Sequence, residues 1–324
     1  MEKFGLRWMN ECQAVYANKW ISHTIACNVK VLNLKVRFPA KARDFGDSLV
    51  HLPGTLFTCE KLEFLRFYDN ESFPETEELK IHAPALEDLR LTDNVSRKFS
   101  LEGLTSLRDV SLDLCHTKRY EQANYGNIVV KQVQAMDCVK VLTLSYRTTV
   151  ALNSATTKLA GGFENLTKLY IQIYCCRWSV LKDLLGCFMK LELLDIKKIL
   201  CANSEHRACW SEPTNVPKCM VHSLVHVSLH GFEGFNDEVE LTRYVLKHGL
   251  AMKRINICCF SHRCDLKKKF RILQKIAMFP RVSPPVKSTF LEMNLMAWLI
   301  HLLDALRCNF EDSQPFGFSL SKTG

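Results

Sequence analysis

The stretch Leu62-Glu63-Phe64-Leu65-Arg66-Phe67 is the clearest copy of a six-residue unit that runs through this chain. In the unit, an apolar residue is followed by two variable residues, a second apolar residue, one variable residue and a third apolar residue. The other copies are Val29–Leu34, Leu86–Leu91, Leu107–Leu112, Val139–Leu144, Leu166–Ile171, Leu191–Ile196, Leu224–Leu229 and Met252–Ile257. These nine copies predict stacked structural repeats, each too small to bury its own apolar face.

Alternation along a strand gives each side chain of the unit a direction. In the copy at Leu62, we expect Leu65 and Phe67 to point into the core, while Arg66 and Tyr68 point to the opposite face. A fully buried Leu or Phe contributes about 1.5–3 kcal/mol, so three apolar anchors per copy build a continuous spine. The unit is similar to the core of a leucine-rich repeat. We therefore predict an α/β fold, an irregular solenoid with a curved parallel sheet and helices or turns behind it.

The copies divide the chain into four expected segments. Residues 1–28 are predicted to form a helical cap that ends at Asn28, and residues 29–200 hold the solenoid repeats. Residues 201–290 open with a polar stretch rich in Cys and Pro, which favours a boundary there. Residues 291–324 are expected to form a divergent helical tail, because charged residues interrupt its apolar run before it reaches a membrane-spanning length.

The C-terminal segment has a strand–helix–strand–helix pattern instead of closely spaced repeats. Its first helix is predicted over 236–248, with Asn236 as the N-cap and Gly249 after its last turn. Its second helix is predicted over 265–279. We expect this second helix to be basic on one face and apolar on the other, at Phe270, Leu273, Ile276 and Ala277.

The composition is that of a globular protein, with 47% hydrophobic and 24% charged residues. The 15 cysteines are an odd number without any CxxC spacing, and the sequence before Trp20 lacks the apolar core of a secretion signal. We therefore expect reduced thiols and a location in the cytoplasm or nucleus. The formal charge of +9 is compatible with an acidic partner.

The sequence contains no motif for nucleophilic, phosphate-binding or metal-dependent catalysis. Cys258, Cys259, His262 and Cys264 come nearest to a metal-ligand cluster, but adjacent cysteines on a strand point to opposite faces. We therefore expect no enzyme activity, no cofactor and no metal. The basic region 253–281 leaves open a nucleic-acid-associated protein, although no aromatic residues alternate with its charged helix for base stacking.

The remaining candidate for function is the face of the sheet that points away from the core, because solenoids bind partners on their sheet face. The expected contact residues are those that follow the second and third anchors of each copy. They are Asn33, Lys35, Arg66, Tyr68, Arg90, Thr92, Ser111, Asp113, Thr143, Ser145, Tyr170, Gln172, Asp195 and Lys197, followed by Ser228 and His230. The first part of this face is basic and aromatic, and the middle is polar.

Two sets of residues carry a family resemblance. The repeat region contributes Leu52-Pro53, Leu56-Phe57-Thr58-Cys59 and Leu62. The C-terminal part contributes Trp210-x-x-Pro213-x-x-Val216-Pro217-x-Cys219, Ser223-Leu224, Gly231-Phe232-x-Gly234, Glu240-Leu241-x-x-Tyr244-x-Leu246 and Phe279-Pro280-Arg281-x-Ser283. These residues resemble plant F-box proteins that combine leucine-rich repeats with a C-terminal FBD domain. The resemblance covers about residues 20–290 and implies that an α/β FBD-like domain over 201–290 caps the solenoid.

The resemblance implies a protein-interaction module, the substrate-recognition part of an SCF-type E3 ubiquitin ligase, whose protein target the sequence does not name. Partner subunits of such a ligase carry out the catalysis. Members of the family open with an F-box that docks on a Skp1-type adaptor. Here the repeats start close to the first residue, so we expect the F-box to be absent and this adaptor not to dock directly. The alternative is an F-box-less binder or decoy of the same targets.

Overall fold

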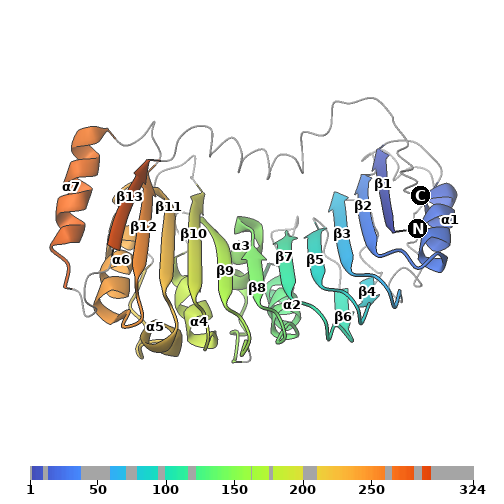
Figure 1. Ribbon diagram of the computed structural model, residues 1–324, viewed down its shortest axis with the longest axis horizontal. Coiled ribbons are helices and arrows are strands. Elements are labelled where there is room, and N and C mark those ends of the chain that lie inside the picture. Colours follow the sequence, from blue (N-terminus) through green and yellow to red (C-terminus); the bar gives the residue numbers. More distant parts are fainter. Residues whose placement is uncertain are drawn as a thin grey trace.

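The computed structural model describes residues 2–9, 14–37, 59–70, 79–93, 99–115, 122–161, 163–174, 178–199, 210–259, 265–280 and 287–292. In this part of the chain, eleven strands form one sheet and two more form a small second sheet. The strands of the large sheet follow one another in chain order, and every neighbouring pair is parallel. Figure 1 shows them as a single row from β1 at one end to β13 at the other. The predicted α/β class with a parallel sheet is confirmed.

The large sheet is built from short strands of four to seven residues. They are β1 (Lys3–Met9), β2 (Val31–Arg37), β3 (Phe64–Asn70), β5 (Asp88–Asp93), β7 (Asp109–Leu114), β8 (Val141–Leu144), β9 (Lys168–Tyr174), β10 (Leu193–Ile199), β11 (His226–Phe232), β12 (Arg254–Cys259) and β13 (Lys287–Glu292). The small sheet pairs β4 (Leu79–His82) with β6 (Phe99–Glu102).

The six-residue unit determines where the strands begin. Each of the nine strands from β2 to β12 in the large sheet starts two residues after the first anchor of its copy, as β3 does after Leu62. A repeated backbone contact precedes each strand: the carbonyl of Glu63 accepts hydrogen bonds from the backbone N–H groups of Glu87 and Asp88 at 2.8 and 3.1 Å. The equivalent bonds recur at every step of the row from β1 to β12. The copies are therefore held in one register.

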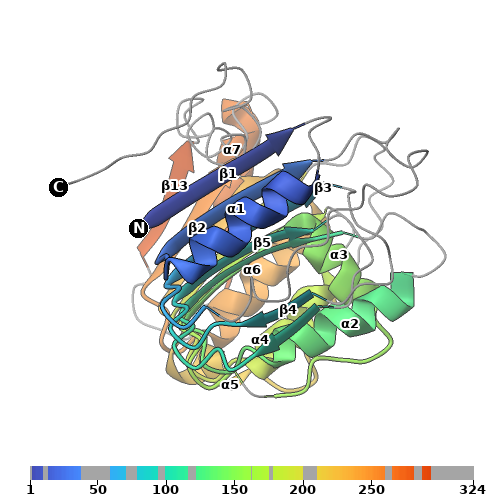
Figure 2. The same cartoon turned by 90° about the vertical axis from the view of Figure 1, so that its right-hand side faces the viewer.

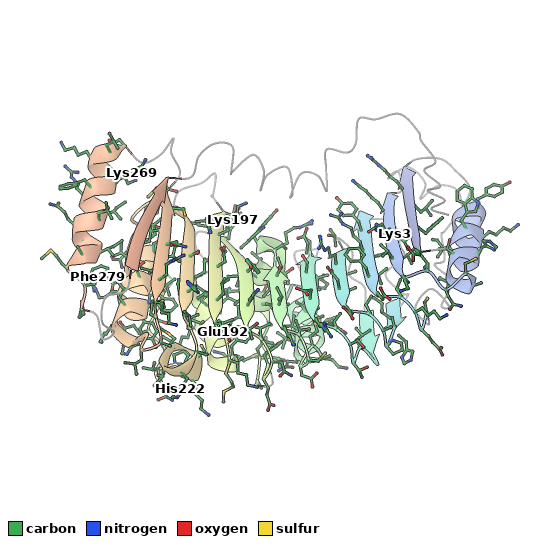
Figure 3. All side chains as sticks on the ribbon, in the orientation of Figure 1. Lys3, Glu192, Lys197, His222, Lys269 and Phe279 are labelled. Atoms are coloured by element: carbon green, nitrogen blue, oxygen red, sulfur yellow. The ribbon has the colours of Figure 1, made fainter. Side chains whose placement is uncertain are left out.

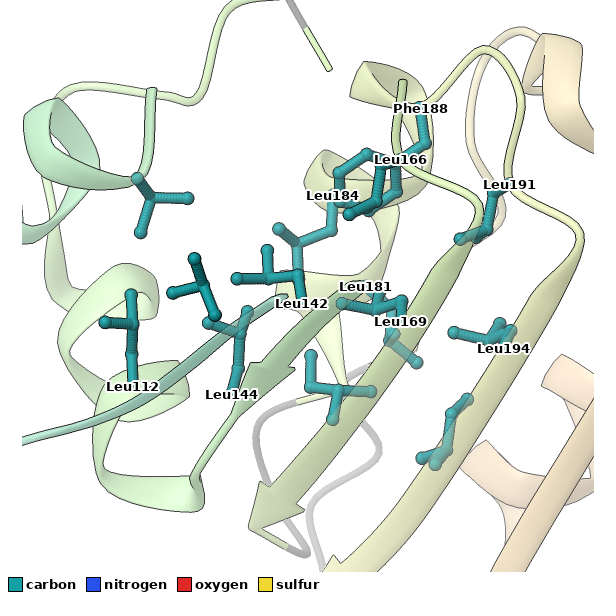
Figure 4. Close-up of a cluster of buried hydrophobic side chains, with 14 of the residues drawn as sticks. Leu112, Leu142, Leu144, Leu166, Leu169, Leu181, Leu184, Phe188, Leu191 and Leu194 are labelled. Carbon is teal, nitrogen blue, oxygen red and sulfur yellow. The ribbon is translucent and has the colours of Figure 1, made fainter. Parts of the chain in front are cut away.

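The anchors form the core. Every anchor side chain of the nine copies is at most 3% exposed. In Figure 4, Leu142, Leu169 and Leu194 of three successive strands lie beside one another and meet Leu181 and Leu184 of α4 (Ser179–Cys187). Burial of each such Leu stabilises the fold by about 1.5–3 kcal/mol. The apolar spine expected from the sequence thus runs through the sheet without a break at residue 200.

Seven helices accompany the sheet in the described part of the chain. They are α1 (Ala14–Ala26), α2 (Gln122–Gln134), α3 (Tyr146–Ser154), α4, α5 (Lys218–His222), α6 (Asn236–His248) and α7 (Leu266–Ala277). Figure 2 shows α2, α4, α5 and α6 together on one side of the sheet. The other side, away from these helices, carries the side chains that alternate with the anchors. None of the helices in the described ranges has the length and apolar character needed to cross a bilayer.

The helix α3 replaces the end of a strand. The strand β8 stops at Leu144, and Ser145 caps α3 by accepting a hydrogen bond from the Thr148 backbone N–H at 3.2 Å. The buried Thr148 hydroxyl donates to the Leu112 carbonyl and accepts from the Leu114 backbone N–H, both at 2.9 Å. Thr148 thereby satisfies the Leu114 backbone N–H of β7, while the Leu112 carbonyl also accepts the Ser145 backbone N–H at 3.0 Å.

Several expectations for the two ends of the chain were wrong in detail. The predicted helix within residues 1–28 covers only Ala14–Ala26, because Lys3–Met9 forms the edge strand β1. Asn28 follows the helix in a left-handed conformation with a φ of 52°. The N-cap of α6 is Phe235, and the expected cap Asn236 is its first helical residue. Of the tail 291–324, expected to be helical, residues 291–292 end the strand β13 and residues 293–324 lie outside the described residues.

Candidate protein-binding face

The strand register collects the expected contact residues into straight rows. We call the side of the sheet opposite the anchors the outer face. Its central row follows the second anchor, and each member is the register partner of the next. The row runs through Asn33, Arg66, Arg90, Ser111, Thr143, Tyr170, Asp195 and Ser228. The structure therefore brings residues from eight separate copies together on one surface.

A second row on the outer face follows the third anchor. It runs through Lys35, Tyr68, Thr92, Asp113, Gln172, Lys197 and His230. Ser145, also expected in this row, lies one residue beyond the end of β8, where its backbone N–H donates to the Leu112 carbonyl at 3.0 Å and its hydroxyl caps α3. Figure 3 shows Lys197 near the end of β10 and Lys3 on β1, toward the other end of the sheet.

A third row of the outer face was missed by the sequence argument. These residues follow the first anchor by two positions and open each strand. They are Val31, Phe64, Asp88, Asp109, Val141, Lys168, Leu193, His226 and Arg254. They have the same parity as the other two rows, so alternation alone was enough to find them.

The end of the outer face near β2, β3 and β5 combines cations with aromatic rings. The Lys35 ammonium lies 5.0 Å from the ring centroid of Tyr68, and the Arg90 guanidinium lies 5.3 Å from that of Phe64. Arg90 also donates to the Asp88 carboxylate through Nε at 3.3 Å and Nη2 at 3.2 Å. Stacking on a ring and a bidentate carboxylate contact both fix the orientation of a guanidinium.

Two carboxylates of β7, Asp109 and Asp113, lie in the middle of the outer face. Arg147 of α3 forms a two-pronged hydrogen-bonded ion pair with Asp113, with Nε at 2.8 Å from Oδ1. Burial, followed by the negative charge of Asp88, raises the pKa of the Asp109 carboxyl above its usual range. Asp109 and Asp88 are register partners on β7 and β5. The two carboxylates therefore concentrate negative charge where the basic end stops.

The far end of the outer face contains a charged pair. His230 Nε2 lies 3.0 Å from Oδ2 of Asp195 on the neighbouring strand. Burial alone would lower the pKa of His230, but hydrogen bonds and charge interactions with Asp195 and Cys258 outweigh it and raise the pKa to about 10. Burial lowers the pKa of the nearby Lys197 ammonium. His230 thus carries a proton, and a positive charge, at neutral pH.

A buried ion cluster lies beneath this end of the sheet. The Lys198 ammonium lies 3.0 Å from Oε1 of Glu233, is ion-paired with Glu238, and is 4.7 Å from the ring centroid of Phe235. The other oxygen of Glu238 accepts backbone N–H groups of Glu233, Gly234 and Phe235 at 2.7–3.1 Å. Burial raises the pKa of the Glu238 carboxyl, against the opposing effect of Lys198. The three side chains are at most 7% exposed, so the cluster joins β10 to the start of α6 and offers no surface to a ligand.

The basic region 253–281 is divided between two elements that differ in position. Arg254 opens β12 on the sheet, whereas the lysines lie on α7 at the end of the molecule, where Figure 3 shows Lys269 and Phe279. The apolar face predicted for this helix was partly wrong: Ile272 and Ile276 are buried, while Phe270 and Leu273 are exposed at 60% and 40%. Which face of α7 is buried could not be predicted from the spacing of its apolar residues alone.

Metal-binding groups do not gather in the described ranges, where no set of three or more His, Cys, Asp or Glu side chains is placed to hold an ion. Cys258 and Cys259 are both buried and neither forms a disulfide, and they lie on opposite faces of β12 as alternation predicts. His262 and Cys264, the other members of the cluster considered from sequence, lie outside the described residues.

Comparisons with known proteins identify relatives over much of the chain. Residues 212–257 match the FBD family. A probable FBD-associated F-box protein of Arabidopsis thaliana is 28% identical over 52% of this chain and 40% of its own length. An FBD-associated F-box protein is 27% identical over 65% of this chain and 46% of its own length. An F-box/FBD/LRR-repeat protein, from the same plant, is 24% identical over 81% of this chain and 64% of its own length.

The chain spans about half the length of these curated relatives, or less, in the first two matches. The FBD match includes Glu233 and Glu238 of the buried ion cluster, the helix α6 and most of β12, but not Lys198. No solved structure matches the chain significantly.

Proposed function

We propose that this chain, which is similar to F-box/FBD/LRR proteins of Arabidopsis thaliana, is the substrate-recognition module of a ubiquitin-ligase assembly. In this proposal the outer face holds a protein target, and partner subunits transfer ubiquitin to the lysines of that target. The chain contributes binding and positioning, and no step of the chemistry. A cytoplasmic or nuclear location accompanies this role.

The observation that carries the proposal is the assembly of the outer face from many copies of one unit. Three rows of polar, charged and aromatic side chains stand in register over neighbouring strands. The anchor side chains that alternate with them are buried in the core. Side chains on such a rigid backbone can vary without disturbing the fold, which suits a surface for recognising a particular protein.

We also propose a division of the chain into four segments. We assign residues 29–200 to a leucine-rich-repeat solenoid and residues 201–290 to an α/β FBD-like cap, with a cap at 1–28 and a tail at 291–324. Support comes from the nine copies in register and from the FBD match at 212–257. Because β10 and β11 pair directly, this cap would extend the sheet of the solenoid and not form a separate body.

Two exposed tyrosines provide a matched test. Tyr170 is 37% exposed on the central row of the outer face, and Tyr16 is 49% exposed on α1. Tagged full-length chains with Tyr170→Ala or Tyr16→Ala would be expressed in plant cells, and co-purifying proteins quantified by mass spectrometry. We expect Tyr170→Ala, alone or with Thr143→Arg, to lower the recovery of specific partners about tenfold, since exposed aromatics often dominate an interface. Tyr16→Ala should leave recovery unchanged. Equal recovery in all variants would contradict the proposal.

A further inference from the structure

We propose that the β9 section of the outer face binds an uncharged, proline-rich segment of the target protein. This inference rests on the proposed function and deepens it by naming the chemistry of the partner. The side chains concerned are Tyr146, Tyr170, Gln172 and Tyr174, which we call the aromatic platform. Three of them lie on the outer face of β9, and Tyr146 is the first residue of α3.

The aromatic platform gathers exposed tyrosine rings. Tyr170 is 37% exposed and Tyr146 is 38% exposed. The rings of Tyr146 and Tyr174 are stacked, with their centroids 6.2 Å apart. Tyr170 and Tyr174 are four residues apart on one strand, which corresponds to about 13 Å. The platform therefore presents a single ring at one end and a stacked pair at the other, and exposed aromatic side chains often dominate the energy of an interface.

Hydrogen bonds hold the platform in place before any partner arrives. The buried Thr149 hydroxyl lies 2.8 Å from the carbonyl oxygens of both Tyr146 and Gln172. The side-chain oxygen of Gln172 also accepts the Tyr146 backbone N–H at 3.4 Å. The start of α3 is therefore fastened to β9. Aromatic side chains that are ordered in advance lose little conformational entropy on binding, which increases affinity.

The polar groups of the platform decide which backbone it suits. A Gln amide has two N–H donors and each Tyr hydroxyl can donate, and Thr143, the register partner of Tyr170, adds another hydroxyl. An ordinary extended peptide on the face of a sheet presents both N–H and C=O groups. A polyproline II segment has no internal hydrogen bonds and its prolines lack the N–H, so it presents mainly acceptors. Donors beside aromatic rings match such a segment.

The length of the platform also suits a polyproline II segment. This conformation advances about 3.1 Å per residue, so five residues span about 12 Å. That span is close to the separation of Tyr170 and Tyr174 along β9. A short proline-rich segment laid along the strand can therefore contact the single ring with one end and the stacked pair with the other.

Charge complementarity favours an uncharged segment. The carboxylates beside the platform are paired within the fold, Asp113 with Arg147 and Asp195 with His230. A carboxylate on the partner would compete with Asp113 and Asp195 for these cations. A cation on the partner would compete with Arg147 and His230 for the carboxylates. An uncharged segment leaves both pairs intact.

The test measures binding of the tagged full chain to a peptide array. Its proline arm holds uncharged nine-residue peptides with four Pro among Ala, Leu, Ser and Gln, and its control arm has Ala at every Pro position. A third arm has Glu in place of Ser and Gln, because Lys168 and Lys197 border the platform. We expect the best proline peptides to bind at least about tenfold more tightly than their Ala counterparts in fluorescence anisotropy.

Three results of the array would overturn the inference. They are the absence of binding in the proline arm, equal binding of the proline and control arms, and tighter binding of the Glu arm. The last result would show that the two lysines, and not the rings, select the partner.

Variants of the full chain locate the site. Tyr146→Ala and Tyr174→Ala should each weaken binding of the best proline peptide about tenfold, because each removes one ring of the stacked pair. Tyr174→Phe keeps the ring and should weaken binding less than about threefold. Tyr16→Ala removes an exposed tyrosine from α1 and should change binding less than about twofold. Similar losses from Tyr146→Ala and Tyr16→Ala would overturn the inference. Circular dichroism confirms that each variant is folded.

The outcomes separate this inference from the proposed function. If no proline peptide binds while Tyr170→Ala still removes partners from plant cells, the aromatic platform does not read proline and the outer face keeps its function. If neither experiment responds to the outer face, both proposals fail.

Discussion

At the scale of single residues, neighbouring residues on a strand have different roles, because one is buried in the core and the next lies on the outer face. Leu169 is fully buried in the spine, and its neighbour Tyr170 is 37% exposed on the outer face. We predict that Leu169→Ala lowers the free energy of unfolding by about 2–5 kcal/mol, because it removes apolar contacts and leaves a cavity. Tyr170→Ala should lower it by less than about 1 kcal/mol. Urea unfolding of both variants measures the difference, and equal midpoints would contradict the assignment of the two faces.

The pair of His230 and Asp195 predicts a pH dependence. The pKa of His230 is raised from 6.5 to about 10 by Asp195 and Cys258, against the opposing effect of burial. Because the folded state binds this proton more tightly, its contribution is fully present below about pH 6.5 and is lost as pH rises through about 10. We expect the unfolding free energy of the wild type to fall over this window more steeply than that of His230→Gln.

The readout is the difference between the two proteins, since burial lowers the pKa of Lys197 and that group also contributes at alkaline pH. Urea unfolding at pH 6.5, 8 and 9.5 supplies the comparison. Parallel curves for the wild type and His230→Gln would show that the histidine does not hold its proton in the fold. Asp195→Asn should give the same flattening as His230→Gln, because it removes the main partner that raises the histidine pKa.

At the scale of elements, two helical glycines differ in their surroundings. A Cβ added to Gly126 of α2 would lie 2.6 Å from the Ala151 carbonyl oxygen of α3, so the backbones of the two helices would have to separate. Nothing lies within 4 Å of a Cβ at Gly186 of α4. We predict that Gly126→Ala destabilises the chain by about 1–3 kcal/mol through overpacking. Gly186→Ala should stabilise it by about 0.5–1 kcal/mol, since Ala favours the helix. Thermal unfolding distinguishes the signs, and matching shifts would contradict the close approach of α2 and α3.

The contact between β10 and α6 depends on the buried ion cluster. Lys198→Met leaves Glu233 and Glu238 buried without their cation, so we predict a loss of about 3–5 kcal/mol in unfolding free energy. Lys197→Met, one residue away on the outer face, should change it by less than about 1 kcal/mol. Chemical denaturation at pH 7 checks both variants. A small effect of Lys198→Met would mean that the cluster does not fasten the two elements.

How well a strand could be predicted from the sequence depended mainly on whether its three anchor positions were all apolar. Three anchors at fixed spacing determined nine strands and their core faces, because each anchor is fully buried. The flanking strand β1 also fits the unit, with Met1, Phe4 and Leu6 at the three anchor positions, so this copy was present in the sequence and was missed. In β13 the second anchor position is Ser288, the register partner of Ile255, so apolar spacing alone could not find it.

Elements that depend on tertiary contacts were less predictable. The helix α3 is stabilised by the Ser145 cap and by a hydrogen bond from the Thr148 hydroxyl to the Leu112 carbonyl of β7. These two residues are 36 positions apart in the chain, so this contact could not be predicted from local sequence. The small sheet of β4 and β6 also requires residues brought together by stacking. Of the candidate site, two rows of the outer face followed from alternation, whereas its pairing of Arg147 with Asp113 came from the unforeseen helix.

At the scale of the whole molecule, the copies of one unit and the FBD-matching segment share a single sheet and a single core. The strands run from β1 to β13 in chain order, with direct pairing across residue 200. One side of this sheet is covered by helices, and the other presents the three rows (Figures 1 and 2). The similarity to FBD-associated F-box proteins and this surface together lead to the central proposal, that the outer face is where a target protein is held.

Site-specific photo-crosslinking tests that claim most directly. A photoreactive amino acid would replace Ser111 on the central row of the outer face, or Lys131 on the exposed side of α2 as the matched control. Both chains would be irradiated in plant cells and their covalent adducts identified by mass spectrometry. The account predicts that one protein target is captured from position 111 and not from position 131. Capture of that target from position 131 alone would contradict it.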